Sequence, residues 1–164
     1  MIADERPSVM HGPRFGLFQL ALGIGLFAAA SALSGPAWIV AWPAVSVGLV
    51  GLGYLGLGPR VFGKRADGSI ALPHLVLLFP YHVVAWARLR WDALRRSEDA
   101  WNEVAPGVFL GRRLTDLAEL PPGTTAVIDM TAEFRAMPGV EARAAYRTLP
   151  TLDAAAPEYE QFAV

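Results

Sequence analysis

The feature that most constrains this chain is a long stretch without a single charged side chain. From Arg14 to Arg60 the sequence contains no intervening Asp, Glu, Lys, Arg or His. Residues 15–33 are apolar apart from Gln19 and Ser31, and as a helix they would reach about 28 Å, close to the ~30 Å hydrocarbon core of a bilayer. The Ser-Gly-Pro turn at 34–36 breaks that helix, and residues 37–57 supply a second apolar run. The sequence therefore predicts an antiparallel transmembrane helical hairpin over residues 15–58.

Small residues predict how the two helices pack. Ala21, Gly25 and Ala29 recur every four residues on the first run, and Ala44 and Gly48 do so on the second. Small side chains at this interval allow two helix backbones to approach closely in lipid. We expect these residues to form the contact between the helices.

A glycine motif in the second run resembles a nucleotide-binding signature. Gly51, Gly53 and Gly56 have the spacing of the dinucleotide-binding pattern, but they lie inside an apolar run and no acidic residue follows at the required distance. We interpret these glycines as helix-packing positions. The sequence therefore predicts no bound cofactor.

Basic residues predict the orientation of the hairpin. Its turn carries none, whereas basic residues occur on both flanks. We expect residues 1–14 to form a cytoplasmic tail, with the soluble part on the cytoplasmic side of the cell inner membrane. The alternative is a cleaved secretory signal, because Arg14 precedes an apolar core and Ala30-Ser31-Ala32 resembles a cleavage site. The immediate second span favours an uncleaved multi-pass anchor. The flanking basic residues are Arg6, Arg14, Arg60, Lys64 and Arg65.

Residues 59–100 form a less regular segment. The apolar stretch 70–87 is interrupted by prolines and histidines, and basic clusters on both sides of it favour the cytoplasm. An interfacial or re-entrant segment with the prolines as kinks satisfies both clusters, and a third span is the alternative. The basic residues Arg88, Arg90, Arg95 and Arg96 are expected either to contact anionic lipid headgroups or to lie on a solvated helix beside Asp92.

Neither a metal nor nucleic acid is an expected partner. His74 and His82 lack a nearby carboxylate or third histidine, so we interpret them as polar contacts rather than metal ligands. The net charge of −1 argues against nucleic acid, because binding phosphates requires a concentrated basic surface. The lipid bilayer is the partner that the sequence predicts most directly.

Residues 101–164 have the pattern of a small α/β domain. A Pro-Gly turn enters a short strand ending at Gly111, and Ala126 to Ile128 do not alternate with polar residues, which predicts a parallel strand covered on both faces. Ligands in α/β folds bind beyond the carboxyl ends of the strands, where Asp129, Thr131 and Glu133 would project. Further predicted elements are a helix over 114–120, a helix or a loop entering a strand over 140–146, a strand over 147–153 and a helix from Pro157.

The polar residues at this strand end have alternative interpretations. Asp129 and Glu133 could form a glycosidase-type acid/base pair, although a carboxylate after a parallel strand commonly accepts N–H bonds from its own turn. Arg112 and Arg113 could approach a phosphate, although pairing with surface acids is the simpler expectation. None of the four is assigned a ligand.

Three segments, in order, carry a resemblance to a known family. EVAPGVFLG at 103–111, AVIDMTAE at 126–133 and YRTLPTLD at 146–153 resemble the opening blocks of the dual-specificity branch of the protein-tyrosine phosphatases, in particular its bacterial membrane-anchored members. The resemblance covers about residues 103–164. It implies an α/β domain with a mostly parallel sheet that hydrolyses phosphate monoesters through a cysteinyl-phosphate intermediate, without metal or other cofactor. It also implies that Asp153 is the general acid.

The chain departs from this family at the nucleophile. The family signature is His-Cys, five residues and Arg, and the 164 residues contain no cysteine. We therefore expect an incomplete α/β domain, the amino-terminal portion of a phosphatase, which would be inactive by itself and would act on a phosphorylated substrate only when completed. The alternative is a non-enzymatic integral membrane protein with a small cytoplasmic α/β interaction module.

Overall fold

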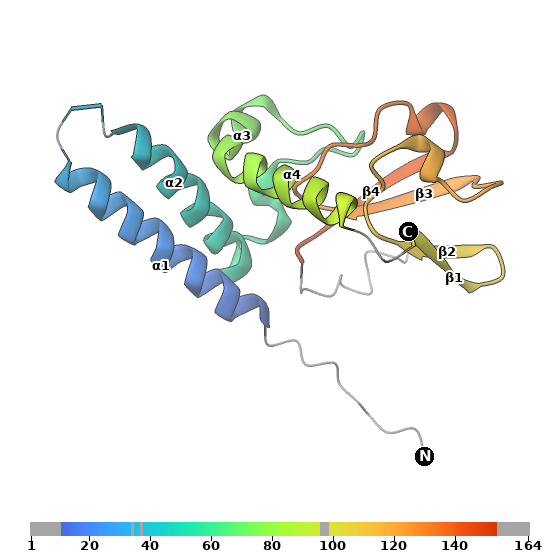
Figure 1. The fold of residues 1–164 in the computed structure, drawn as a ribbon, viewed down its shortest axis with the longest axis horizontal. Helices are drawn as coiled ribbons and strands as arrows, with labels where there is room; N and C mark the ends of the chain where they lie inside the picture. The colour runs from blue at the N-terminus through green and yellow to red at the C-terminus, as the bar shows by residue number, and fades with distance from the viewer. Residues whose placement is uncertain (1–10, 34, 37, 96–98, 154–164) are drawn as a thin grey trace, which may run out of the picture.

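The computed structural model describes residues 11–33, 35–36, 38–95 and 99–153, and in these it has two parts. Two long apolar helices pack as a hairpin, and a small mixed α/β region follows them (Figure 1). The predicted helical hairpin is confirmed, as is the change to mixed α/β structure after it. The α/β region contains two small sheets rather than one.

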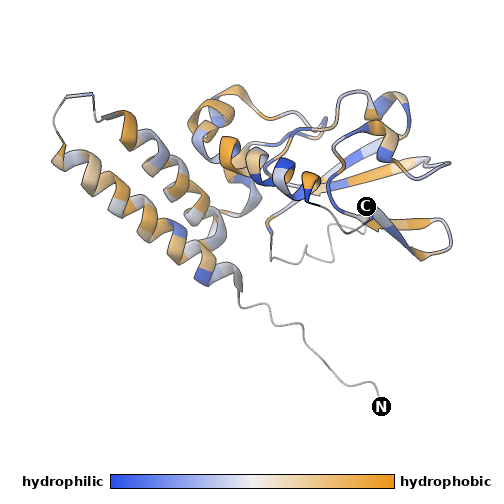
Figure 2. Cartoon of the chain, viewed as in Figure 1, coloured by the Kyte–Doolittle hydropathy of each residue, from blue (hydrophilic) through white to orange (hydrophobic). Residues whose placement is uncertain are grey.

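The hairpin consists of α1 (His11–Ala32) and α2 (Trp38–Leu52). Helix α1 is itself long and apolar enough to cross a membrane, and the second candidate span, residues 39–62, consists of α2 together with the helical turns that follow it. They direct large apolar side chains outward, for example Phe18 and Ile24, each 63% exposed, and apolar colour covers both helices in Figure 2. A soluble surface rarely presents so many large apolar groups, so the hairpin is compatible with membrane insertion.

The hairpin packs through a different face of α1 from the one predicted. An ideal Cβ at Gly23 would lie 2.8 Å from the Ala44 carbonyl oxygen and 2.9 Å from Gly48 Cα, whereas one at Gly25 would meet nothing within 4 Å. Ala44 and Gly48 are therefore at the interface as expected. The prediction for α1 was wrong: Ala21, Gly25 and Ala29 are exposed, and the buried small residues recur every seven positions, at Gly16, Gly23 and Ala30.

The chain unwinds after α2 and folds back along it. A π-helical turn, η1 (Gly53–Leu57), contains a non-helical residue at Gly56, whose φ is 149°. The 3-10 helix η2 (Gly58–Phe62) follows and brings Phe62 into one core cluster with Val50. Gly51 packs against Gly16 and Leu20, as its interpretation as a packing residue predicted. Gly56 instead permits a backbone conformation that other residues rarely adopt.

The apolar stretch 70–87 forms parts of two helices rather than one. Helix α3 (Leu72–Leu77) and helix α4 (Phe79–Leu94) are separated by Leu78, and each has a proline in its first turn. A proline lacks the backbone N–H that a continuous helix would need at this point, so the break follows from the sequence. Both helices contact α2.

The α/β region is built from two strand pairs. Strands β1 (Trp101–Ala105) and β2 (Val108–Gly111) pair antiparallel around the predicted Pro-Gly turn, in which Gly107 has a φ of 73°. Strands β3 (Ala126–Thr131) and β4 (Ala145–Thr151) pair in parallel, as predicted for the two segments that end near a carboxylate. Strand β1 was not predicted.

Two local predictions in this region need correction. Residues 114–120 contain only the 3-10 turn η3 (Leu117–Glu119), in which the Asp116 side chain accepts the Ala118 amide. For 140–146 the alternative of a loop entering a strand is confirmed, because the short turn η4 (Val140–Ala142) is followed by the start of β4. Strand β3 is covered on one face only: Ile128 is 57% exposed because nothing in the described residues packs over that face. The helix predicted from Pro157 lies outside the described residues.

A shared core joins the hairpin to the α/β region. Val50 of α2, Phe62 of η2 and Leu78 between α3 and α4 pack with Ala132 and Leu152, which follow β3 and β4. The carboxyl ends of the parallel strands are therefore held against the side of α2. This arrangement decides which residues can reach the candidate site.

Candidate functional site

A tight hairpin in residues 63–70 carries a lysine to the end of the parallel strands. Lys64 pairs with Ile70, and the Arg65 amide donates to the Ser69 carbonyl at 2.8 Å. Gly68, with a φ of 75°, permits the turn, and its carbonyl accepts the Ala136 amide at 2.8 Å. An ideal Cβ at Gly68 would lie 2.6 Å from the Tyr146 hydroxyl, so this hairpin is pressed against the sheet.

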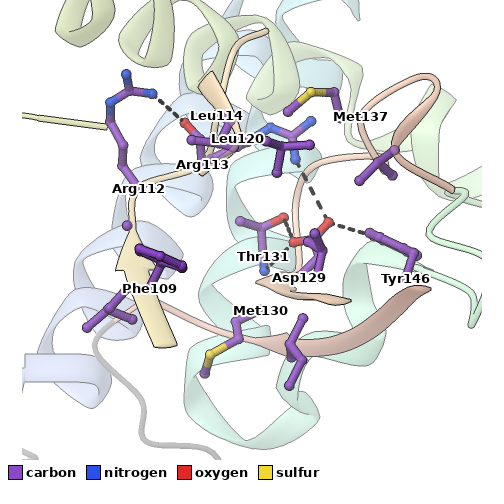
Figure 3. A pocket seen from close by; sticks show the side chains of 15 residues that line it. Phe109, Arg112, Arg113, Leu114, Leu120, Asp129, Met130, Thr131, Met137 and Tyr146 are labelled. Carbon is purple, nitrogen blue, oxygen red and sulfur yellow. Dashed lines mark hydrogen bonds and ion pairs between the residues drawn. The ribbon is translucent and has the colours of Figure 1, made fainter. Parts of the chain in front are cut away.

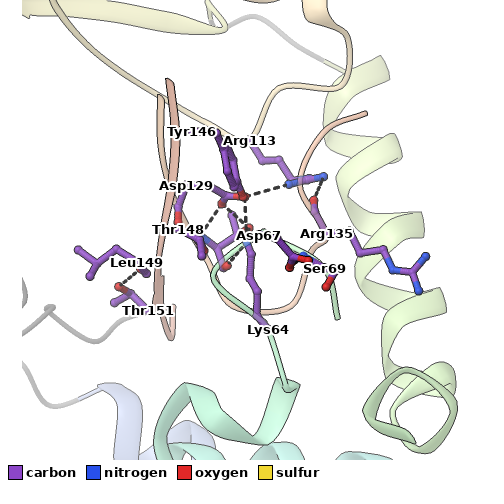
Figure 4. Close-up of polar contacts among 11 residues, drawn as sticks. Lys64, Asp67, Ser69, Arg113, Asp129, Arg135, Tyr146, Thr148, Leu149 and Thr151 are labelled. Atoms are coloured by element: carbon purple, nitrogen blue, oxygen red, sulfur yellow. Dashed lines mark hydrogen bonds and ion pairs between the residues drawn. The ribbon is translucent and has the colours of Figure 1, made fainter. Parts of the chain in front are cut away.

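Asp129 is the centre of a buried polar cluster (Figure 4). Lys64 Nζ lies 2.8 Å from Asp129 Oδ2, and the Tyr146 hydroxyl donates to the same oxygen at 2.7 Å. Oδ1 accepts the Thr131 amide at 2.9 Å and the Thr131 hydroxyl at 2.7 Å. Lys64, Arg113, Asp129, Thr131 and Tyr146 are called the Asp129 cluster below.

The ammonium group of Lys64 donates to three acceptors. Its side chain is fully buried, and Nζ also donates to the carbonyl and the hydroxyl oxygen of Thr131, at 2.6 and 3.2 Å. An ammonium has three hydrogens, so the donors and the acceptors are matched. Burial of the charge is offset by the ion pair and these bonds together.

Arg113 closes the cluster from the segment after β2. Its Nη1 lies 3.9 Å from Asp129 Oδ2, and Nη2 donates to the Arg135 carbonyl at 2.7 Å. The guanidinium lies over the rings of Phe134 and Trp86, at 4.9 and 5.8 Å from their centroids. Such stacking suits the weakly hydrated guanidinium. The prediction of a surface acid as partner was wrong for Arg113, which is buried.

Arg112 pairs with an acidic side chain, as expected. It forms a two-pronged ion pair with Glu119, with Nη2 to Oε1 at 2.9 Å and Nη1 to Oε2 at 3.2 Å. Glu119 also accepts the Thr115 amide at 2.7 Å. This pair fixes the loop between β2 and β3, and it occupies the guanidinium of Arg112, a candidate phosphate contact in the sequence analysis.

The buried charges shift one another's protonation equilibria. Burial raises the pKa of Asp129, but hydrogen bonds from Lys64 and Tyr146 outweigh it, so the net shift is downward. Burial lowers the pKa of Lys64, partly opposed by its bond to Asp129. Burial and the bond to Asp129 raise the pKa of Tyr146. The directions favour an ionised Asp129 bonded to a neutral Tyr146.

A cavity of about 210 Å³ lies beside the cluster, between the β2 segment and β3 (Figure 3). Most of its wall is apolar, and its polar part is supplied by Arg112, Arg113, Asp129, Thr131 and Tyr146. Each of the two carboxylate oxygens of Asp129 already accepts two hydrogen bonds. Asp129 is therefore a structural hydrogen-bond acceptor rather than a free base. This agrees with the expectation that it accepts an N–H bond from its own turn. The other lining residues include Phe109, Leu110, Leu114, Leu120, Val127, Met137 and Val140.

The second predicted carboxylate, Asp153, lies just beyond β4. It is exposed, whereas Glu133, which follows β3, is half-buried. Burial raises the pKa of Glu133, and the negative charge of Asp153 raises it further. The charge of Asp153 therefore acts on Glu133 at the carboxyl edge of the β3–β4 pair, apart from the fully bonded Asp129.

The two described histidines of the α3–α4 segment occupy packed positions. His82 is 4% exposed and lies beside the rings of Phe62 and Tyr81, each with a centroid separation of 6.3 Å. His74 packs against Gly63, where an ideal Cβ would meet the imidazole. Within the described ranges, no group of three or more His, Cys, Asp or Glu side chains could hold a metal ion.

Sequence reasoning found Asp129 and Thr131 but missed Lys64 and Tyr146. Lys64 served only as an orientation signal, because its role depends on a contact across 65 positions of the chain. The available signal was weak: a lysine in a Gly-Lys-Arg-Ala-Asp-Gly turn directly after an apolar span. No family model, curated protein or solved structure matches the chain.

Proposed function

We propose that this chain is the amino-terminal portion of a membrane-anchored, cysteine-dependent phosphatase of the dual-specificity type. The observation that carries the proposal is the position of Asp153, which is exposed two residues after the end of β4, the strand that pairs in parallel with β3. The carboxyl end of a parallel strand is where α/β enzymes place catalytic groups. The three segments that resemble this family form β1–β2, β3 and β4, in that order.

The chemistry assigns one step to this chain. A cysteine thiolate supplied by residues beyond these 164 would attack phosphorus, forming a sulfur–phosphorus bond while the bond to the ester oxygen breaks. Asp153, as the carboxylic acid, donates its proton to the leaving oxygen. Its carboxylate then takes a proton from the water that attacks phosphorus, and the sulfur–phosphorus bond breaks to release inorganic phosphate and restore the thiolate. The Asp129 cluster holds the adjacent strand end in place and takes no part in proton transfer.

We also propose a location. The hairpin spans the cell inner membrane, and the α/β region lies on its cytoplasmic side, supported by the outward apolar side chains of α1 and α2 and by basic residues on both flanks of the hairpin. Reporter domains fused at positions 1 and 100 are both expected to report the cytoplasm. A periplasmic signal at position 100 would contradict this location.

The catalytic proposal is tested by extending the chain. The 164 residues alone should hydrolyse an aryl phosphate no faster than background, and activity should appear when a downstream segment with the His-Cys, five residues, Arg signature is added. In the extended protein, Asp153→Asn should lower kcat by roughly 10²- to 10⁴-fold. The loss should shrink for esters with acidic leaving groups, which need less protonation.

Asp92→Asn is the matched control for this experiment. Asp92 is an exposed carboxylate on α4 that pairs with Arg88 at 3.6 Å, so its neutralisation should leave kcat unchanged. Hydrolysis by the 164 residues alone would exclude the cysteine mechanism. Equal activity of the Asp153→Asn and Asp92→Asn variants would remove Asp153 from its assigned role.

One observation favours the second candidate, a non-enzymatic membrane protein with an α/β interaction module. The open face of β3 carries Ile128 and Met130, which are 57% and 36% exposed. Exposed apolar strand positions of this kind can bind another protein. An extended protein that folds, carries the signature and still lacks phosphatase activity would support this candidate over the enzyme.

A further inference from the structure

The break between α3 and α4 leaves backbone groups that need hydrogen-bond partners from elsewhere in the protein. Carbonyl groups at the end of α3 and amides at the start of α4 lack partners within their own helices. At a water-exposed break, solvent would satisfy them. In hydrocarbon each unsatisfied group would cost several kcal/mol, so the protein must supply partners.

Side chains of α2 supply these partners. The Trp42 indole Nε1–H donates to the carbonyl oxygens of Val76 and Leu77, at 3.1 and 3.2 Å. The Ser46 hydroxyl oxygen accepts the Tyr81 amide at 3.3 Å. Trp42 and Ser46 are one helical turn apart, and they lie on a different face of α2 from Ala44 and Gly48, which contact α1.

Prolines and burial complete the arrangement. Pro73 and Pro80 stand in the first turns of α3 and α4, where a missing N–H removes a donor that would otherwise need a partner. Leu78, at the break itself, is fully buried, as is Ser46. The break is therefore sealed by α2 on its inner side.

The outer side of α3–α4 is apolar. From Ile70 to Ala87 the sequence carries no Asp, Glu, Lys or Arg. Beyond this stretch come Trp91 and the arginines of α4, and Arg95 lies over the Trp91 ring at 4.0 Å. The large apolar side chains that point outward are Leu72 at 67%, Val76 at 55%, Leu77 at 41%, Phe79 at 50%, Val83 at 49% and Val84 at 65% exposed.

We propose that α3 and the first half of α4 form a re-entrant element inserted into the hydrocarbon core beside α2, with lipid acyl chains covering its outer side. The contact with α2 makes this surface continuous with that of the hairpin. Trp91 and the arginines of α4 then lie at headgroup depth, where aromatic and basic side chains are favoured. The proposal requires the hairpin to be in the bilayer but does not depend on phosphatase activity.

The absence of native cysteine makes a direct test possible. Single cysteines would be introduced and spin-labelled in the full chain, reconstituted into vesicles of zwitterionic and anionic phospholipid. Val76→Cys and Val83→Cys report α3–α4, Ile24→Cys on the outer side of α1 is the hydrocarbon reference, and Val108→Cys on β2 is the water reference. Collision with oxygen marks a lipid-facing label, and collision with a nickel chelate marks a water-facing one.

The proposal expects labels at Val76 and Val83 to match the label at Ile24 and to differ from that at Val108. Nickel-accessible labels at Val76 and Val83 with a lipid-facing label at Ile24 would overturn the re-entrant element alone. A nickel-accessible label at Ile24 would overturn the membrane hairpin as well. Neither result bears on the aryl phosphate assay, so the failure of each proposal is distinguishable.

Trp42→Phe tests the hydrogen-bond argument. Phenylalanine keeps an aromatic ring to stack on Phe79, whose centroid lies 5.8 Å from that of Trp42, but it removes the indole donor. The Leu77 carbonyl would then lose its donor and the Val76 carbonyl would keep only the Leu78 amide, so amide exchange at the start of α4 should accelerate roughly 5- to 150-fold. Trp91→Phe, at an exposed ring, should leave this exchange unchanged. Equal exchange in both variants would overturn the requirement for the donor.

Discussion

At the residue scale, the pair formed by Lys64 and Asp129 connects the segment after the hairpin to the central strand. Burying two charges is costly, and the pair is retained where additional hydrogen bonds satisfy the remaining donors and acceptors. Here Thr131 and Tyr146 provide them. The pair therefore ties residues 63–70 to the carboxyl end of β3.

Removing the lysine should expose how much this connection contributes. Lys64→Met keeps most of the side-chain volume but leaves Asp129 with only the Arg113 guanidinium, 3.9 Å away, as a charged partner, so we expect a loss of up to about 3–5 kcal/mol of stability. The free energy would be measured from amide exchange of β3 in the reconstituted chain. Arg65→Met, at the exposed neighbour, is the control. Equally small losses of stability in the Lys64→Met and Arg65→Met variants would show that the Lys64–Asp129 pair contributes little.

Glu133 should show the opposite sign of pH dependence from a salt-bridged carboxylate. Its pKa in the folded chain is raised above the ordinary value of 4.5. The stability contribution of Glu133 is therefore fully present below pH 4.5 and is lost as the pH rises through its folded pKa. We expect Glu133→Gln to stabilise the chain at pH 7, with the gain disappearing below pH 4.5. Glu141→Gln, at an exposed position, is the control, and an equal gain in both variants would contradict the role of burial at Glu133.

Local chemistry at these residues was predictable, whereas their long-range partners were not. The bond from the Thr131 amide to Asp129 joins residues two apart, and its pattern can be read from a strand that ends at Asp-x-Thr. The contact from Lys64 depends on how the hairpin, α3–α4 and the sheet pack together. No periodic pattern in the sequence indicates that Lys64 lies close to Asp129.

At the element scale, the helices were easier to predict than their contact faces. The absence of charge over residues 15–59 is enough to indicate two apolar helices. It does not identify the interface, because α1 has small residues on two faces: Ala21, Gly25 and Ala29 on one, and Gly16 and Gly23 on the other. The open face of β3 is a similar case, since the apolar run at 126–128 suits a strand with one or two covered faces.

The two glycine faces of α1 provide a matched pair of substitutions. Gly23→Ala would place a Cβ 2.8 Å from the Ala44 carbonyl oxygen, so it should separate the helices and destabilise the hairpin by about 1–3 kcal/mol. Gly25→Ala meets open space and should be neutral or stabilising by up to about 1 kcal/mol, because alanine favours helix. Thermal unfolding in detergent would compare them. The same sign for both would contradict the assigned interface.

At the scale of the whole molecule, α2 is the element on which both parts are assembled. One face packs on α1 through Ala44, Gly48 and Gly51, and another contacts α3 and α4 through Trp42 and Ser46. Val50 then enters the core shared with the ends of β3 and β4. The α/β region is therefore not an independent unit attached by a linker, since its core includes side chains from the hairpin.

This shared core predicts the behaviour of residues 101–164 in isolation. Without residues 1–100, Ala132 and Leu152 lose Val50, Phe62 and Leu78, and a segment of about 60 residues is marginal even with a complete core. Asp129 would also lack its lysine.

We therefore expect the isolated segment to aggregate or to unfold without a cooperative transition, as monitored by circular dichroism during heating and by sedimentation. The reconstituted full chain should protect the amides of β3 from exchange, which serves as the positive control. A sharp thermal transition of monomeric 101–164 would show that the strands fold without the hairpin, and the packing of Val50, Phe62 and Leu78 would then be docking rather than a condition for folding.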